Sequence, residues 1–146
     1  MAHKFVIVSH DAVPDILGSA EIQNIPALTV STKGRVDRQA FFAAVGESLP
    51  LDPPLESSRS WDALADSLWE GLHRMRVPRL ILVWTDAGSA KAEHKQDFQH
   101  ALWVLRDLAE ELSDARSAVG EPTELSVYVA VDAEDEPITR RLLHHP

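Results

Sequence analysis

The chain alternates between short apolar runs and longer segments in which apolar residues recur with helical spacing. Apolar runs bounded by turn residues predict β-strands, and apolar residues three and four positions apart predict helices. The predicted strands cover residues 6–8, 27–31, 79–84 and 125–131. The predicted helices cover residues 37–49, 60–75 and 93–113. Because strands alternate with helices, the pattern indicates an α/β fold with parallel strands and right-handed crossovers.

Capping residues and apolar stripes support these helix assignments. Asp37 and Ser60 stand at predicted helix starts, where a side-chain oxygen can accept hydrogen bonds from the first amides. The predicted core stripe of the helix after Ser60 consists of Trp61, Leu64, Ala65, Leu68 and Leu72. The predicted core stripe of the longest helix consists of Phe98, Ala101, Leu102, Leu105, Ala109 and Leu112.

The two ends of the chain lack such periodicity. Residues 9–26 contain Asp, Pro, Gly and Asn, and we interpret them as an irregular connection. The residues after 132 begin with acids and a proline, and we interpret them as an acidic turn and a short tail.

Length and charge narrow the class of protein. The 146 residues suit one domain, and 45% hydrophobic with 25% charged residues is ordinary for a globular protein. The net charge is −9: residues 1–60 hold 7 acids and 5 bases, and residues 61–146 hold 16 acids and 9 bases. Nucleic acids and anionic membranes require a basic face, so we expect neither as a partner. An acidic second half suits a basic protein partner.

The N-terminal segment carries no export or membrane signal. Its longest apolar run, Phe5 to Val8, is too short for a signal-peptide core or a membrane span. The chain has no cysteine, so disulfides do not contribute to its stability. We therefore expect a cytoplasmic protein.

Motifs for enzymatic chemistry are absent from the sequence. The glycines never form Gly-x-Gly, and there is no Gly-x-Ser-x-Gly, so neither a phosphate loop nor a nucleophile elbow is expected. His94 and His100 are six residues apart and face different directions on a helix, which does not suit metal binding. We expect no cofactor, no metal and no enzymatic activity, although catalysis by paired carboxylates remains an alternative.

Two predicted helices combine acidic and aromatic residues away from their apolar stripes. Asp62 and Asp66 are one turn apart, and Trp69 extends the same side. A first-turn carboxylate such as Asp62 complements the helix dipole, whereas Asp66 lies beyond that effect. The long helix places Trp103 and Asp107 one turn apart. Aromatic residues beside acids on rigid elements suit an interface with a basic cleft.

The same residues carry a family resemblance. The segment Trp-Asp-Ala-Leu-Ala-Asp-Ser-Leu at 61–68 follows a proline-bearing loop and precedes the strand 79–84, which ends in Trp84. Together with Ala-Leu-Trp-Val-Leu-Arg-Asp at 101–107, this order resembles the barstar family, intracellular protein inhibitors of microbial guanyl-specific ribonucleases. The resemblance covers residues 27–132.

The resemblance implies a small three-stranded parallel sheet packed with helices, to which residues 6–8 could add an N-terminal strand. The implied division is an N-terminal strand and connection over 1–26, a barstar-like domain over 27–132, and an acidic turn and tail over 133–146.

The implied function is inhibition of a microbial guanyl-specific ribonuclease in a 1:1 complex, by a chain that is monomeric when free. An acidic helix and the loop before it would block the cationic active site, with Asp66 in its phosphate site and Asp62 and Asp107 beside it. Glu56 and Arg59 of the loop would also contact the partner. The alternative is a protein-binding module of the same fold with a non-nuclease partner.

The sequence departs from the family pattern in its aromatic residues. The loop 53–59 contains no aromatic residue, and Ala65 stands where the family often has Trp between the two aspartates. We expect Trp69 or Trp103 to supply the missing aromatic contact.

Overall fold

A computed structural model of the chain describes residues 4–55, 60–88, 92–114, 116, 118 and 120–144. Its centre is a four-stranded parallel sheet in the order β1-β4-β3-β2. The strands are β1 (Lys4–Ser9), β2 (Ala27–Val30), β3 (Arg79–Trp84) and β4 (Glu124–Val131). The predicted α/β class is confirmed, and the additional N-terminal strand is present at one edge of the sheet.

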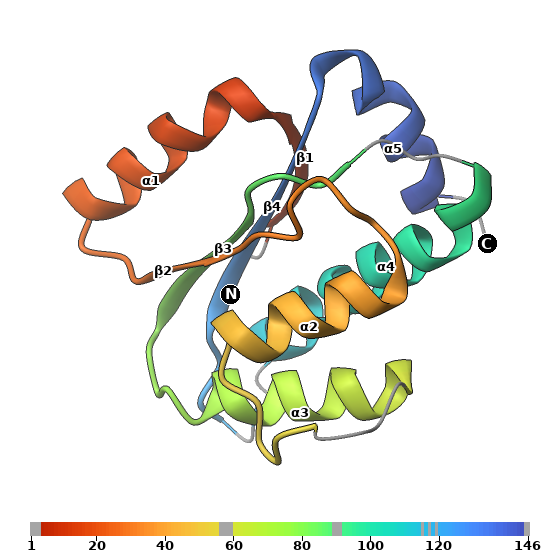
Figure 1. Ribbon diagram of the computed structural model, residues 1–146. Coiled ribbons are helices and arrows are strands. Elements are labelled where there is room, and N and C mark those ends of the chain that lie inside the picture. The colour runs from red at the N-terminus through yellow and green to blue at the C-terminus, as the bar shows by residue number, and fades with distance from the viewer. Residues whose placement is uncertain are drawn as a thin grey trace.

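The helices cover both faces of this sheet. They are α1 (Val13–Ile22), α2 (Arg38–Ser48), α3 (Trp61–His73), α4 (Lys95–Ser113) and α5 (Glu136–His144). Short 3-10 turns span His10–Ala12, Ala92–His94 and Ala133–Asp135. α1 lies on one side of the sheet, and α2, α3 and α4 lie on the other (Figure 1). α3 packs against α4, and α5 packs against both β1 and α4.

Two predictions about the chain ends are wrong, because both regions contain helices. The segment 9–26 holds α1, and the residues after 132 hold α5. Pro14 and Pro137, which suggested interruption, each occupy the first turn of a helix, where proline loses no intrahelical hydrogen bond. Within the described part of the chain, no helix has both the length and the apolar character needed to cross a membrane.

The predicted caps fix the starts of α2 and α3. The Asp37 carboxylate accepts a hydrogen bond from the Ala40 amide at 3.1 Å, and the Ser60 hydroxyl accepts one from Ala63 at 3.3 Å. Burial raises the pKa of Asp37, but hydrogen bonds from Ala40 and Arg35 outweigh it and hold the pKa below its usual value. Both helices therefore begin where the sequence placed them.

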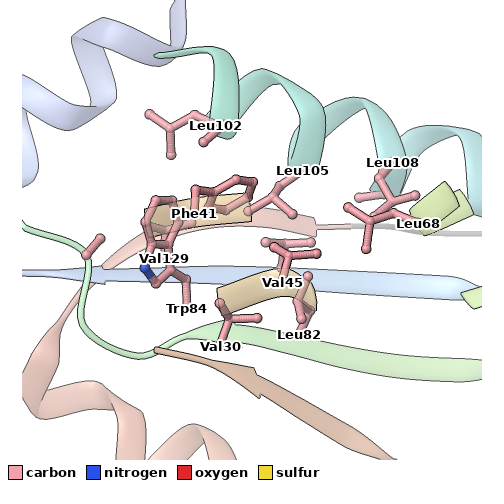
Figure 2. Packing of buried hydrophobic residues seen from close by; sticks show 14 of the residues in the cluster. Val30, Phe41, Val45, Leu68, Leu82, Trp84, Leu102, Leu105, Leu108 and Val129 are labelled. Atoms are coloured by element: carbon pink, nitrogen blue, oxygen red, sulfur yellow. The ribbon is translucent and has the colours of Figure 1, made fainter. Parts of the chain in front are cut away.

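The hydrophobic core fills the space between the sheet and the helices α2, α3 and α4. Figure 2 shows Leu102 and Leu105 of α4 pointing toward side chains of α2 and the sheet, and Leu108 of α4 beside Leu68 of α3. All six residues of the predicted α4 stripe are buried. Trp84 is 1% exposed at the end of β3, and its indole Nε1 donates to Thr32 Oγ1 at 3.0 Å. This packing fixes α3 and α4 relative to one another.

Candidate functional site

A groove of about 540 Å³ lies between α3 and α4 on the outer surface of the molecule. We call it the acidic groove because carboxylates from both helices line it: Asp62 and Asp66 from α3, and Asp107 and Glu111 from α4. Its other lining residues are Trp61, Ala65, His100, Trp103, Val104 and Leu108.

Helix packing explains why these carboxylates gather. Asp62 and Asp66 are one turn apart, as are Asp107 and Glu111, so each pair lies along one helix face. Burial of Leu68 and its apolar neighbours on the other side of α3 turns the acidic pair outward. Since α3 packs against α4, the two pairs line opposite sides of one groove.

The negative charge of the groove is largely uncompensated. Partial burial raises the pKa of Glu111, and the nearby charges of Asp107, Asp66 and Glu110 raise it further. Asp107 pairs with Arg106 at 3.3 Å, whereas no described Lys or Arg lies within 4.0 Å of a carboxylate oxygen of Asp66 or Glu111. A cationic partner would therefore find carboxylates that the protein itself leaves without a counter-charge.

A second hollow of about 430 Å³ continues the acidic surface along α3. It is lined by Asp52, Asp66, Trp69, Glu70 and Glu111, so it shares two carboxylates with the acidic groove. The Trp69 ring stacks on the His73 ring with centroids 4.6 Å apart and planes 20° apart. Asp66 and Glu111 consequently stand at the centre of a longer acidic surface.

Aromatic side chains form one end of the acidic groove. The His100 ring lies between the rings of Trp61 and Trp103, with centroid distances of 5.5 and 5.7 Å. Trp61 also contacts Phe42 edge-on at 5.1 Å, and its buried indole Nε1 has no hydrogen-bond partner among the described residues. Rigid aromatic surface therefore adjoins the carboxylates, as in many protein interfaces.

The residues just before α3 are fastened to that helix. The Asp52 amide donates to the Ser67 carbonyl at 3.1 Å, and the Ser67 hydroxyl donates to the Pro53 carbonyl at 2.9 Å. Arg74 Nε lies 2.6 Å from Asp52 Oδ2. These bonds hold the described part of the loop, up to residue 55, against the side of α3.

The structure brings most of the predicted site residues together. Asp62, Asp66, Asp107 and Trp103 line the acidic groove, and Trp69 lies in the adjoining hollow. Glu56 and Arg59 lie outside the described residues.

Sequence reasoning did not predict the other residues that line the acidic groove, among them the aromatic Trp61 and His100 and the carboxylate of Glu111. Trp61 and Ala65, both assigned to the core stripe, are only half-buried and line the groove. Trp61 still packs against the core, whereas the assignment of Ala65 to it is wrong. A signal for Glu111 existed, since it follows Asp107 by one helical turn.

Comparison with known proteins places the fold in a family. No curated protein and no solved structure shows significant similarity to the chain. One family model, described as Barstar (barnase inhibitor), matches residues 25–125, which is more than half of the chain and includes α2, α3, α4 and three of the four strands in whole or in part. The chain belongs to the barstar family.

Proposed function

We propose that this protein inhibits a ribonuclease by placing its acidic groove over the enzyme's cationic active site. The observation that carries the proposal is the gathering of four carboxylates from α3 and α4 in one groove. An enzyme that cleaves RNA must attract phosphates, so its active site presents cationic groups that carboxylates can engage. The description of the matching family as barnase inhibitors supports the same function.

The geometry suggests a distinct role for each part of the surface. Asp66 and Glu111 belong to both hollows, and Asp66, on the acidic helix α3, would enter the active site and accept hydrogen bonds in place of a phosphate. Asp62 and Asp107 would bind cations at the rim of that site. Trp61 and Trp103 would supply apolar contact area. The complex would be 1:1, the chain itself would bind no RNA and catalyse no reaction, and the inhibitor would act in the cytoplasm.

The test is a ribonuclease inhibition assay with matched charge variants. Wild-type protein should inhibit guanyl-specific ribonucleases, and Asp66→Asn should bind about 10- to 100-fold more weakly. That range corresponds to about 1.5–3 kcal/mol for a charge-assisted hydrogen bond.

The control variant is Asp15→Asn on α1, which makes the same charge change on the other side of the sheet. Its affinity should stay within about threefold of wild type, since only long-range attraction is altered. Equal inhibition by Asp66→Asn and Asp15→Asn would show that Asp66 does not imitate a phosphate.

A second candidate is a protein-binding module of the same fold whose basic partner is not a nuclease. The absence of aromatic residues from the loop 53–59 favours it, because the contact surface differs from the family pattern. Under this alternative the wild-type protein would inhibit none of a panel of guanyl-specific ribonucleases, while Asp66→Asn would still weaken capture of a basic protein.

A further inference from the structure

α5 lies outside the part of the chain that matches the family model, yet it contacts a wall of the acidic groove. It packs between β1 and α4 and buries Thr139, Leu142 and Leu143 (Figure 1). Its last turn therefore lies against α4, the helix that carries Trp103 and Asp107.

Side chains of α4 satisfy the carbonyl groups at the end of α5. The last carbonyls of a helix have no intrahelical partner. Gln99 Nε2 donates to the Leu142 carbonyl at 2.8 Å. Trp103 Nε1 and Arg106 Nη1 both donate to the Leu143 carbonyl, each at 3.2 Å. The guanidinium also complements the negative end of the α5 dipole.

Two of these α4 side chains, Trp103 and Arg106, connect the end of α5 to the acidic groove. Trp103 lines the groove, so the bond to Leu143 fixes the orientation of one of its aromatic walls. Arg106 also contacts Asp107 Oδ1 through Nε at 3.3 Å and through Nη2 at 3.4 Å. The carbonyl of Leu143 thus orients one groove residue directly and a second through the guanidinium.

We propose that α5 is a positioning element of the acidic groove, which holds Trp103 and Asp107 in their binding orientation before a partner arrives. This role rests on the proposed function, because it concerns the same surface. Side chains that are ordered in advance lose less conformational entropy on binding. Arg106 is accordingly a positioning residue, which acts on Asp107 directly and on Trp103 through the Leu143 carbonyl that both side chains share.

The first experiment uses the free full-length protein and needs no ribonuclease. Hydrogen exchange of the Trp103 indole N–H, measured by NMR and assigned with Trp103→Phe, reports whether α5 holds this side chain. Arg106→Met should speed that exchange about 3- to 10-fold, and Arg106→Lys should restore much of the protection. The control is Arg141→Met, which removes the same charge from α5; among the described residues, Arg141 bonds only the Pro137 carbonyl of its own helix.

The second experiment measures association and dissociation rates with a guanyl-specific ribonuclease. Loss of the Arg106 charge makes the groove more negative, so charge alone predicts faster association and no faster dissociation. A positioning role predicts instead that the complex with Arg106→Met dissociates about 3- to 10-fold faster than that with the wild type. Arg106→Lys should restore much of the wild-type dissociation rate. Arg141→Met should dissociate as the wild type does.

The outcomes separate this proposal from the proposed function. Unchanged indole exchange in Arg106→Met, or dissociation equal to that of Arg141→Met, would overturn the positioning role while ribonuclease inhibition stands. If wild-type protein bound no ribonuclease, the proposed function would fail and the positioning role in inhibition with it. Altered exchange would then show only that α5 orders Trp103. Thermal unfolding of each variant checks that the fold is retained.

Discussion

Gly71 is the point where α3 touches the loop that precedes it. A β-carbon at this position would lie 2.1 Å from the Pro50 carbonyl oxygen and 2.6 Å from its carbonyl carbon. Because the colliding atoms belong to the backbone, no side-chain rotation can relieve the contact. We predict that Gly71→Ala destabilises the protein, although alanine is intrinsically the better helix former by about 1 kcal/mol.

The magnitude follows from the contacts around Gly71. Overpacking a well-packed site costs about 1–3 kcal/mol. Moving the loop away also strains the bonds from the Asp52 amide to Ser67 and from the Ser67 hydroxyl to Pro53, each worth about 1 kcal/mol. After the stabilisation from alanine's higher helix propensity is subtracted, the free energy of unfolding should fall by about 2–3 kcal/mol. For a domain of this size, Tm should fall by roughly 5–10 °C.

Urea and thermal unfolding of two variants test this prediction. Gly46→Ala is the matched control, because Gly46 is in the exposed part of α2 and no atom beyond the neighbouring helix backbone lies within 4 Å of its added β-carbon. That variant should gain about 0.5–1 kcal/mol. The reasoning would be refuted if Gly71→Ala were as stable as Gly46→Ala or the wild type.

Two further predictions concern carboxylates. Glu111→Gln should raise the free energy of unfolding at pH 7 and low salt by a few tenths of a kcal/mol, while weakening ribonuclease binding. The pKa of Glu111 is higher in the folded than in the unfolded protein, so its negative charge opposes folding at pH values above the unfolded pKa. The stability gained by Glu111→Gln should therefore vanish as the pH falls below the unfolded pKa. A wild-type protein more stable than Glu111→Gln at pH 7 would contradict this prediction. Asp37→Ala should cost about 1 kcal/mol through loss of the α2 cap, measured by urea unfolding. The folded pKa of Asp37 is lowered, so the wild type should lose its advantage as pH falls from the unfolded pKa through the folded one; a constant difference would count against the charged cap.

Much of the fold could be predicted from the sequence because burial leaves a clear pattern in its central elements. β3 and β4 carry long apolar runs, and α4 carries a complete apolar stripe. α1 and α5 were missed because their first-turn prolines resembled interruptions. Local patterns therefore identified the interior of the fold better than its ends.

The candidate site was predictable only within each helix. The spacing of Asp62 and Asp66 follows from helical geometry alone, whereas the approach of Glu111 to them depends on how α3 packs against α4. Trp61 was placed in the core because it lies at one side of the apolar stripe. In the fold that side is left partly uncovered and becomes a wall of the groove.

The bond from Trp103 to α5 could not be predicted for a different reason. Its acceptor is the main-chain carbonyl of Leu143, and every residue has such a group. No residue type therefore marks this partner in the sequence.

The pairing of β1 with β4 means that β1 gains its hydrogen-bonding partner only when a strand much later in the chain has been synthesised. Lys4 pairs with Ser126, so β1 leaves the ribosome roughly 120 residues before its partner strand. At ~5–20 residues per second, its apolar residues wait about 6–24 s during synthesis. α5 follows β4 at once, and Arg140 Nη2 then donates to the Ile7 carbonyl of β1 at 3.2 Å. The later segment thus fastens the earlier strand, and the sheet is completed only after β4 and α5 have been synthesised.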